Sequence, residues 1–542
     1  MIRYRSPFVV RFAVLIAALM MIAAVAPVAA VETPTLSAPD PGPGDTNSVL
    51  YDAVLADERE EIYAATAGRL TRYRIEATLT PAGDQPATIA GTLDLSYYND
   101  TGKKQSALYV RLYPNAGEYA EGGMTLDRVT VGGEEVTPRL SVADTVAKVT
   151  LPEAVASEET VDLEIAFTTT VPTDPSSSYG MFRLETGSGT YALAHWEPLL
   201  AGYDPVSGWN REPPSEFGDP VFTNAGLWEV DLTAPSDLVF VTTGSEVASE
   251  TTEDGQTRHH FVSGPVRDFV MAADADFQSD SLEVGGTTVT SWYNPDDVEG
   301  GQEVMLYGAQ SLEIYNRWFG AYPYAELDLV QVDLGGGAAG VEFPQLMFIG
   351  GDHYDSSAFT QRIPGFLEFV VVHEVAHQWW YAMVGNNQYL HAFMDEGLTN
   401  YVSTVYFAEQ YGADIGAQQL DMNLLLPYLS MLFSGNGDQI ADWPTDDFPS
   451  QEDYGATVYA KASLGFDAIR QAVGDDAFFA ALTDYADAFR FKVATPVDLL
   501  AAFERASGQD LGELWRHWFE AEEGTQDYDA ADLARVLREF GQ

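Results

Sequence analysis

The sequence predicts an α+β protein in which a domain of short antiparallel strands precedes a mainly helical domain. Three observations lead to this fold class. From Tyr73 to about Phe277, short runs such as TVDLEIAF and LWEVDLTA alternate apolar and polar residues between turn residues. After Gln302 the apolar residues recur at helical spacing. The 542 residues, 46% of them hydrophobic and 12% aromatic, are enough for two or three packed domains.

Residues 1–30 are predicted to be an export signal. Three arginines fall within the first eleven residues, an apolar stretch covers 12–26, and the small residues of 28–30 fit a cleavage site. We therefore expect a cleaved signal peptide and a secreted or cell-surface location. The alternative is an uncleaved anchor, because the apolar stretch reaches residue 31 with one proline interrupting it. No later segment is long and apolar enough to span a bilayer.

The remaining chain is predicted to hold a linker and two domains. Residues 31–48 are rich in proline and glycine and favour a flexible linker. We expect the β domain over 49–276, opening with a short helix between 49 and 67, and the helical domain over 277–542. In the helical domain we expect one strand, AELDLVQVDL, and helices over EVMLYGAQSLEIYNRWFG, 363–384, 393–411 and several stretches between 417 and 540.

Charge and cysteine content exclude several classes of partner. Acidic residues outnumber basic ones by 82 to 27, a formal net charge of −55. A field of that sign repels nucleic acid and anionic lipid headgroups, so neither is an expected partner. We expect no stable membrane insertion beyond an uncleaved N-terminal segment. The chain contains no cysteine, which excludes disulfides and lipid attachment to a thiol. The oligomeric state is not legible in the sequence.

The stretch VVHEVAHQWW, residues 371–380, places two histidines and a glutamate in an apolar run. His373 and His377 are four residues apart, so on a helix they project from one face and suit a single tetrahedral Zn²⁺ at ~2.0–2.1 Å each. Glu374 is then placed to act as general base toward an attacking water. The motif itself lacks a third protein ligand.

Two residues compete to be the third ligand, Glu396 and His391. The closely spaced pattern HExxHxxGxxH fails here, because Trp380 and Met383 occupy its glycine and histidine positions. Nothing around His391 has helical spacing to the first pair. Glu396 lies in the helical segment FMDEGLTNY, with eighteen residues between it and His377, so a second helix can present its carboxylate. We expect one Zn²⁺ per chain in an open catalytic site.

These motifs together resemble the aminopeptidase N and leukotriene hydrolase family of gluzincin zinc metallopeptidases. HEVAH and the glutamate of DEGLTNY have that family's spacing, and GVEFP stands where it carries a Gly-x-Met-Glu-Asn exopeptidase motif. TVYAKASLGF resembles its Tyr-x-Lys-Gly stretch, and YALAHWEPLLAGYD its segment leading into the cleft. The resemblance covers about residues 73–524. It implies a saddle- or sandwich-like β domain before a thermolysin-like catalytic domain, in a shortened form without the family's large C-terminal helical domain.

The resemblance also implies roles for single residues. Glu374 is the expected base, and Tyr459 is the expected phenol that stabilises the oxyanion of the reaction. Gly340 and Glu342 are expected to bind substrate, with the Glu342 carboxylate capturing the free α-amine so that cleavage follows the first residue. Glu197, in HWEP, is a candidate second amine-binding carboxylate. Two positions depart from the family pattern: the exopeptidase motif reads Val-Glu-Phe, and alanine follows the Tyr-Ala-Lys of residues 459–461.

The expected function is that of an exported zinc aminopeptidase acting on peptides. One alternative is a zinc endopeptidase whose open cleft takes longer chains. The other is a catalytically inactive, peptide-binding surface module, which a missing ligand or base would support; none is missing from the sequence.

Overall fold

The structure is a computed structural model that describes residues 48–540, except for 120, 174–178, 216, 219–220, 337 and 355–364. The predicted signal peptide and nearly all of the predicted linker lie outside the described residues. Residues 41–542 form one compact unit. Within the described part of the chain, no helix combines the length and the apolar character that crossing a membrane requires.

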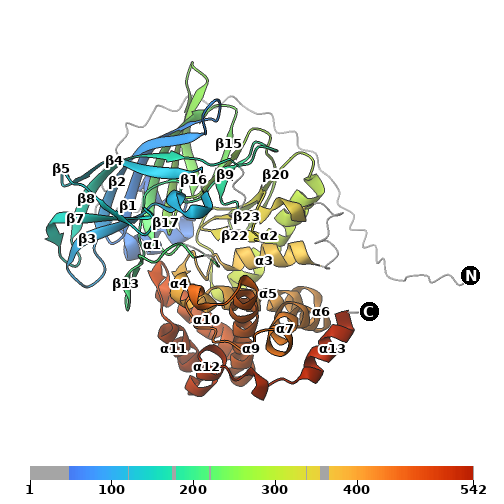
Figure 1. Ribbon diagram of the computed structural model, residues 1–542. Helices are drawn as coiled ribbons and strands as arrows, with labels where there is room; N and C mark the ends of the chain where they lie inside the picture. The colour runs from blue at the N-terminus through green and yellow to red at the C-terminus, as the bar shows by residue number, and fades with distance from the viewer. Residues whose placement is uncertain are drawn as a thin grey trace, which may run out of the picture. The chain divides into compact units, whose positions relative to one another are not determined.

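The N-terminal half is built on an eight-stranded sheet (Figure 1) with the order β16-β17-β14-β1-β2-β8-β4-β5. Its pairs are antiparallel except β1 and β14, which run parallel from Thr71 beside Gly226. A parallel pair requires a long connection, and the rest of the β domain supplies it. The strands are β1 Thr71–Thr80, β2 Thr88–Tyr98, β4 Gly123–Val131, β5 Glu134–Glu135, β8 Thr160–Thr170, β14 Gly226–Pro235, β16 Ser245–Thr251 and β17 Gln256–Val266.

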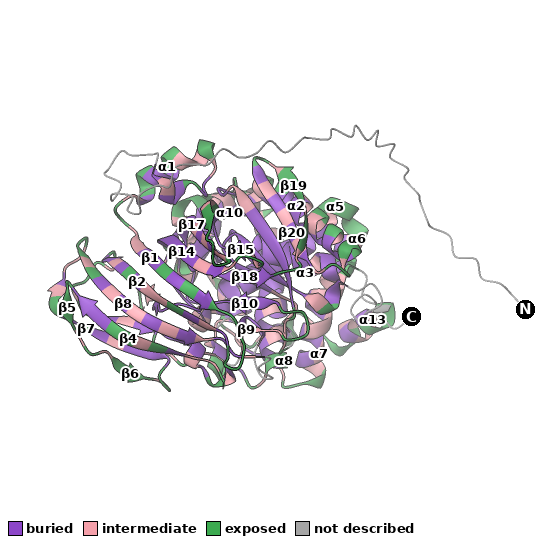
Figure 2. Cartoon of the chain, turned by 90° about the horizontal axis from the view of Figure 1, so that it is seen from above, coloured by how far each residue is buried: buried purple, intermediate pink, exposed green. Residues whose placement is uncertain are grey.

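Two four-stranded sheets complete this β domain, with the orders β15-β18-β10-β9 and β11-β3-β7-β6. Along strands such as β2 and β8, buried residues alternate with more exposed ones (Figure 2), so one face of the sheet packs into the core. The strands are β3 Gln105–Arg111, β6 Arg139–Ser141, β7 Val146–Val155, β9 Phe182–Leu184, β10 Tyr191–Leu193, β11 Leu199–Leu200, β15 Val239–Thr242 and β18 Met271–Asp274. The short helix expected near the start is α1, Ala56–Thr66.

The second half opens with a five-stranded mixed sheet, of which the sequence predicted only β21. Its order is β19-β20-β21-β23-β22, and the helices α2 (Val298–Phe319) and α3 (Phe366–Ala376) pack against it. The missed strands β22 and β23 have four and five residues, too few to show an alternating pattern. The strands are β19 Gln278–Val284, β20 Thr287–Tyr293, β21 Glu326–Val332, β22 Gly340–Phe343 and β23 Leu346–Gly350. The boundary placed at residue 277 stays a prediction.

Several helix bounds differ from those predicted. α2 begins at Val298, ahead of the predicted stretch. α3 ends at Ala376 rather than at residue 384, because the backbone N–H groups of residues 382–384 bond to carbonyls five residues back instead of four. α5 begins at Glu396 with the Asp395 side chain as its N-cap. A π-helical segment, Gly455–Lys461, was not predicted. The other helices are α4 Gln388–His391, α6 Ala413–Leu420, α7 Leu426–Ser434, α8 Gln451–Tyr454, α9 Ala462–Val473, α10 Asp475–Phe489, α11 Pro496–Ser507, α12 Gly512–Phe519 and α13 Ala530–Phe540.

Candidate active site

Three buried side chains converge where α3 meets α5. The Nε2 atoms of His373 and His377 are 3.1 Å apart, and they lie 3.2 and 3.3 Å from the same Oε2 of Glu396. The two histidines come from one face of α3 because they are four residues apart. Glu396 comes from the first turn of α5, where the Asp395 side chain accepts the Glu396 backbone N–H at 2.9 Å. The structure thus brings together the three residues that the sequence predicted as ligands.

This arrangement fits a tetrahedral zinc ion. Two ligand atoms at ~2.0–2.1 Å from a tetrahedral ion stand about 3.4 Å apart, close to the separations seen here. His377 ends α3, and its Nδ1 lies 3.0 Å from the Trp380 carbonyl oxygen, which leaves Nε2 to face the other two ligands. Two imidazoles and one carboxylate leave a fourth position for water or substrate, as in catalytic zinc sites.

The contacts among His373, His377 and Glu396 also shift their pKa values. Burial alone favours the neutral form of Glu396, but its hydrogen bonds to His373 and His377 outweigh burial and hold its pKa below the ordinary value. Burial lowers the pKa of His373. At His377 burial is outweighed by the hydrogen bond to Glu396, which raises the pKa to about 9. The carboxylate is therefore ionised at neutral pH, as a metal ligand must be.

Glu374 lies beside the three ligands and packs against β22. It is buried, and a Cβ added to Gly340 would stand only 2.3 Å from its Oε1. The strand therefore approaches the expected base as closely as a residue without a side chain allows. Glu342 lies two residues further along β22, with its Oε1 3.9 Å from His377 Nδ1. Ligand-type atoms of Glu342, Glu374 and His377 all fall within 4.8 Å of one another.

Tyr459 reaches the site from the π-helical segment. Its hydroxyl donates a hydrogen bond to Oε1 of Glu396, the oxygen turned away from the histidines, and its ring stacks on His373 at 5.9 Å. The Asn400 side chain holds the backbone, donating from Nδ2 to the Tyr459 carbonyl at 2.9 Å. Local π-helical turns often occur at functional sites, where they redirect a side chain.

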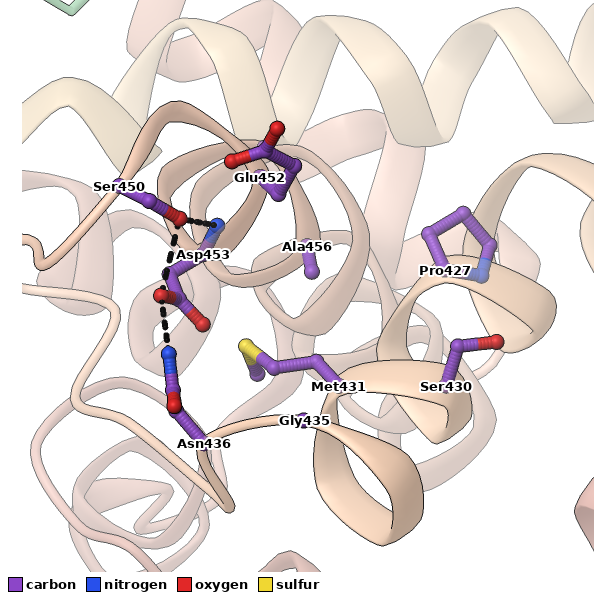
Figure 3. Close-up of a pocket in the computed structure, with 10 residues that line it drawn as sticks. Pro427, Ser430, Met431, Gly435, Asn436, Ser450, Glu452, Asp453 and Ala456 are labelled. Carbon is purple, nitrogen blue, oxygen red and sulfur yellow. Dashed lines mark hydrogen bonds between the residues drawn. The ribbon is translucent and has the colours of Figure 1, made fainter.

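The segment before Tyr459 is fixed by a small polar network in a neighbouring hollow of about 480 Å³ (Figure 3). There the Asp453 carboxylate accepts hydrogen bonds from Ser450 Oγ at 3.0 Å and Asn436 Nδ2 at 2.7 Å. Ser450 in turn caps α8 by accepting the Asp453 backbone N–H. These three contacts fix α8, and α8 runs directly into the π-helical segment that carries Tyr459.

A cavity of about 340 Å³ joins the candidates. It is lined by His373, Glu374 and Glu396, by Gly340 and Glu342 of β22, and by Tyr459. Residues 338 and 339, which precede β22, also contribute. Six of the eight predicted site residues therefore line one cavity, and His377 lies behind it in contact with His373 and Glu396.

Glu197 is not among the residues that line this cavity. It is 1% exposed, and among the described residues neither carboxylate oxygen has a hydrogen-bond partner. Burial raises the pKa of Glu197 well above its ordinary value, which favours the neutral acid. The amine-binding role of Glu197 stays a prediction.

Gln378 is a site residue that sequence reasoning missed. It is fully buried, donates from Nε2 to the Phe343 carbonyl at 2.9 Å, and accepts the Gln345 backbone N–H at 2.8 Å. These two bonds tie the turn after β22 to the residue that follows His377. The available signal was a polar residue placed directly after HEVAH, in an otherwise apolar stretch.

Comparison with known proteins supports the family resemblance. Residues 305–518 match the Peptidase family M1 domain, and this range holds the three converging residues, Glu374, Glu342 and Tyr459. The match agrees with the predicted resemblance to this family of zinc metallopeptidases. The strands and helices described above confirm the predicted α+β fold class.

The relatives found by sequence comparison are distant. Aminopeptidase M1-C of Oryza sativa subsp. japonica is 24% identical over 303 residues, which cover 54% of this chain and 34% of that protein. Aminopeptidase N of Acetobacter pasteurianus is 26% identical over 233 residues, 40% of this chain and 64% of that protein. The matches to the plant protein and to a puromycin-sensitive aminopeptidase of Caenorhabditis elegans span about a third of those proteins' lengths.

Solved structures of M1 zinc metallopeptidases share the fold across most of the chain. A mutant M1 zinc metallopeptidase from Deinococcus radiodurans bound to a Tyr-Ser-Ala substrate has 17% identity and a TM-score of 0.59, covering 84% of this chain and 94% of that one. A two-domain M1 zinc metallopeptidase bound to L-tryptophan has 18% identity and a TM-score of 0.60, with the same coverage. At this identity, these structures establish the fold.

Proposed function

We propose that this protein is an exported, zinc-dependent aminopeptidase that removes N-terminal residues from peptides. The observation that carries the proposal is the position of Glu342: a buried carboxylate in the same cavity as the zinc ligands and the base. A free peptide N-terminus is cationic, whereas an internal amide is neutral. A fixed carboxylate beside the reacting centre therefore selects the chain end by a charge-assisted hydrogen bond.

The residues of the cavity divide the chemical work. When bound by His373, His377 and Glu396, zinc lowers the pKa of its water towards ~7 and polarises the scissile carbonyl. Glu374 takes the proton of the attacking water and delivers it to the departing amine. The Tyr459 hydroxyl, which donates to Glu396 in this structure, turns to the oxyanion that develops on the former carbonyl.

Export is part of the proposal and rests on the sequence of residues 1–30, with their basic start, apolar stretch and small-residue cleavage site. Peptides are the proposed partners. The charge of −55 supports the expectation that nucleic acid is not one of them.

The test measures hydrolysis by the mature protein of a panel of aminoacyl fluorogenic substrates and matched peptides. Each substrate is supplied with a free and with an acetylated N-terminus, and each assay is run in the presence and absence of a chelator. We expect chelator-sensitive hydrolysis of the free substrates and little hydrolysis of the acetylated ones. Equal cleavage of both would replace this proposal with the zinc endopeptidase. Zinc binding with no hydrolysis of either would indicate the inactive peptide-binding module.

A substitution tests whether Glu342 selects the free N-terminus. Glu342→Ala is expected to raise KM and lower kcat/KM for aminoacyl substrates by about ten- to a hundredfold, because one charge-assisted contact of ~1.5–3 kcal/mol is lost. Glu409→Ala is a matched control, since Glu409 is an exposed glutamate of α5 paired with Arg317. Glu342 has no part in amine recognition if both variants behave like the parent enzyme.

A further inference from the structure

Two consecutive residues of the β domain are buried against the segment that follows the zinc-ligand helix. Arg267 and Asp268 lie between β17 and β18 and are 1% and 0% exposed. The segment they contact, residues 377–385, runs from the end of α3 to the short strand β24, Val384–Gly385. A buried arginine and a buried aspartate are costly unless they are bonded, so their partners reveal their purpose.

Arg267 donates hydrogen bonds to backbone carbonyls from three separate parts of the chain. Nε bonds the Tyr381 carbonyl at 2.5 Å, and Nη2 bonds those of Met383 at 3.3 Å and Lys492 at 2.8 Å. Nη1 bonds the Thr223 carbonyl at 3.0 Å. The backbone of the segment lies directly on the guanidinium group, since a Cβ added to Gly385 would stand 2.2 Å from Arg267 Cζ.

Asp268 holds the same segment through a side chain. The hydroxyl of Tyr381 donates a hydrogen bond to Oδ2 of Asp268 at 2.6 Å, and both residues are buried. Tyr381 is therefore fixed at two points, by its carbonyl to Arg267 and by its phenol to Asp268.

The residue fixed in this way is the direct neighbour of the group that orients His377. The Trp380 carbonyl oxygen lies 3.0 Å from His377 Nδ1, and one peptide further along, Tyr381 is tied to the β domain. The turn also closes on His377 itself, because the Ala382 backbone N–H donates to the His377 carbonyl at 3.0 Å. A shift of Tyr381 would therefore move both the Trp380 carbonyl and the imidazole that depends on it.

We propose that Arg267 and Asp268 are positioning residues for the zinc ligand His377, acting through Tyr381 and the Trp380 carbonyl. The β domain thereby contributes to zinc retention. Partners that orient a metal-bound histidine typically account for 10–100-fold in metal affinity. The inference rests on the zinc site of the proposed function.

The test measures how fast zinc leaves the folded protein. Tyr381→Phe removes one oxygen and keeps the ring, and zinc transfer to an excess of a chromophoric chelator gives the dissociation rate. We expect the variant to release zinc about tenfold faster than the parent. Tyr293→Phe is the matched control, because Tyr293 is an equally buried tyrosine whose hydroxyl donates to Asp280 at the same 2.6 Å, in the hairpin of β19 and β20.

Two further variants separate positioning from general loss of stability. Asp268→Asn should release zinc about as fast as Tyr381→Phe. The double variant should release it at nearly the same rate, because each of the three proteins lacks the same hydrogen bond between Tyr381 and Asp268. Arg267→Lys, which keeps the charge and loses the three-way fork, should also release zinc faster. The inference is overturned if the Tyr381→Phe and Tyr293→Phe proteins release zinc at equal rates with equal thermal stability. A parent protein that binds no zinc would instead refute the proposed function.

Discussion

Replacing Gly340 with alanine should disable the base without disturbing the metal. The backbone at Gly340 has an ordinary negative φ, so alanine fits the strand itself. The obstacle is steric: the new methyl carbon would lie 2.3 Å from Oε1 of Glu374 and 2.6 Å from its Cδ and Cγ. Ordinary carbon–oxygen contacts need more than about 3 Å. The Glu374 side chain can change its rotamer more easily than the strand can shift, so we expect its carboxylate to move.

The size of the effect follows from that displacement. Relieving the overlap requires the Glu374 carboxylate to move by about 1 Å, and a misplacement of that size can cost about a hundredfold in rate. We therefore expect kcat to fall by about ten- to a hundredfold, within the ~10²–10⁴ that a general base contributes. Zinc content and thermal stability should change little, because the ligands belong to α3 and α5 and the overlap is confined to one flexible side chain.

The assay compares kcat, KM and zinc content of Gly340→Ala with those of Gly351→Ala. At Gly351 an added Cβ would meet nothing closer than Gln331 Nε2 at 3.4 Å, so this variant controls for the substitution itself. In a Glu374→Ala background, which lacks all three overlapping atoms, Gly340→Ala should cost less than in the parent. Unchanged kcat, or a rise in KM alone, would show that Glu374 does not occupy this position during the reaction.

Three other variants test the remaining groups of the site. His377→Ala should lose the zinc equivalent while His391→Ala keeps it, by elemental analysis; a full equivalent bound to His377→Ala would discard the proposed ligand set. Glu374→Gln should keep zinc while activity falls by at least ~10²–10⁴, and near-normal turnover with zinc bound would remove Glu374 from the mechanism. Tyr459→Phe should keep zinc and lose ~2.7–4 kcal/mol of transition-state stabilisation, seen as a lower kcat; a change confined to KM would assign Tyr459 to binding.

The convergence of the three proposed ligands was predictable because most of it depends on local geometry. His373 and His377 are four residues apart, and residues at that spacing lie on one face of any α-helix. Glu396 was predicted from its distance along the chain, together with the helical pattern that follows it. Glu342 and Tyr459 came from motif order, and the cavity that they share with the triad appears only in the folded chain.

Features set by distant parts of the chain were not predictable. The helix pattern continues past Ala376, yet beyond it the backbone hydrogen bonds span five residues, and Arg267 of the β domain holds the carbonyls of Tyr381 and Met383. No pattern within residues 363–384 carries that information. The same holds for Glu197: its motif resembles a cleft segment, but the packing around it, not its own sequence, decides whether its carboxylate meets the cavity.

Close backbone approach explains a second glycine of the site, Gly397, directly after the ligand Glu396. It too lacks a positive φ, and an added Cβ would stand 2.7 Å from the Ala462 Cβ and 3.0 Å from the Val458 carbonyl oxygen. α5 and the segment carrying Tyr459 therefore touch backbone to backbone at this point. A side chain larger than alanine at 462 would push against the start of α5 and move Glu396 away from the Tyr459 hydroxyl. The departure from the family's Tyr-x-Lys-Gly pattern is tolerated because alanine still fits, and because Gly397 supplies the missing space from the other side.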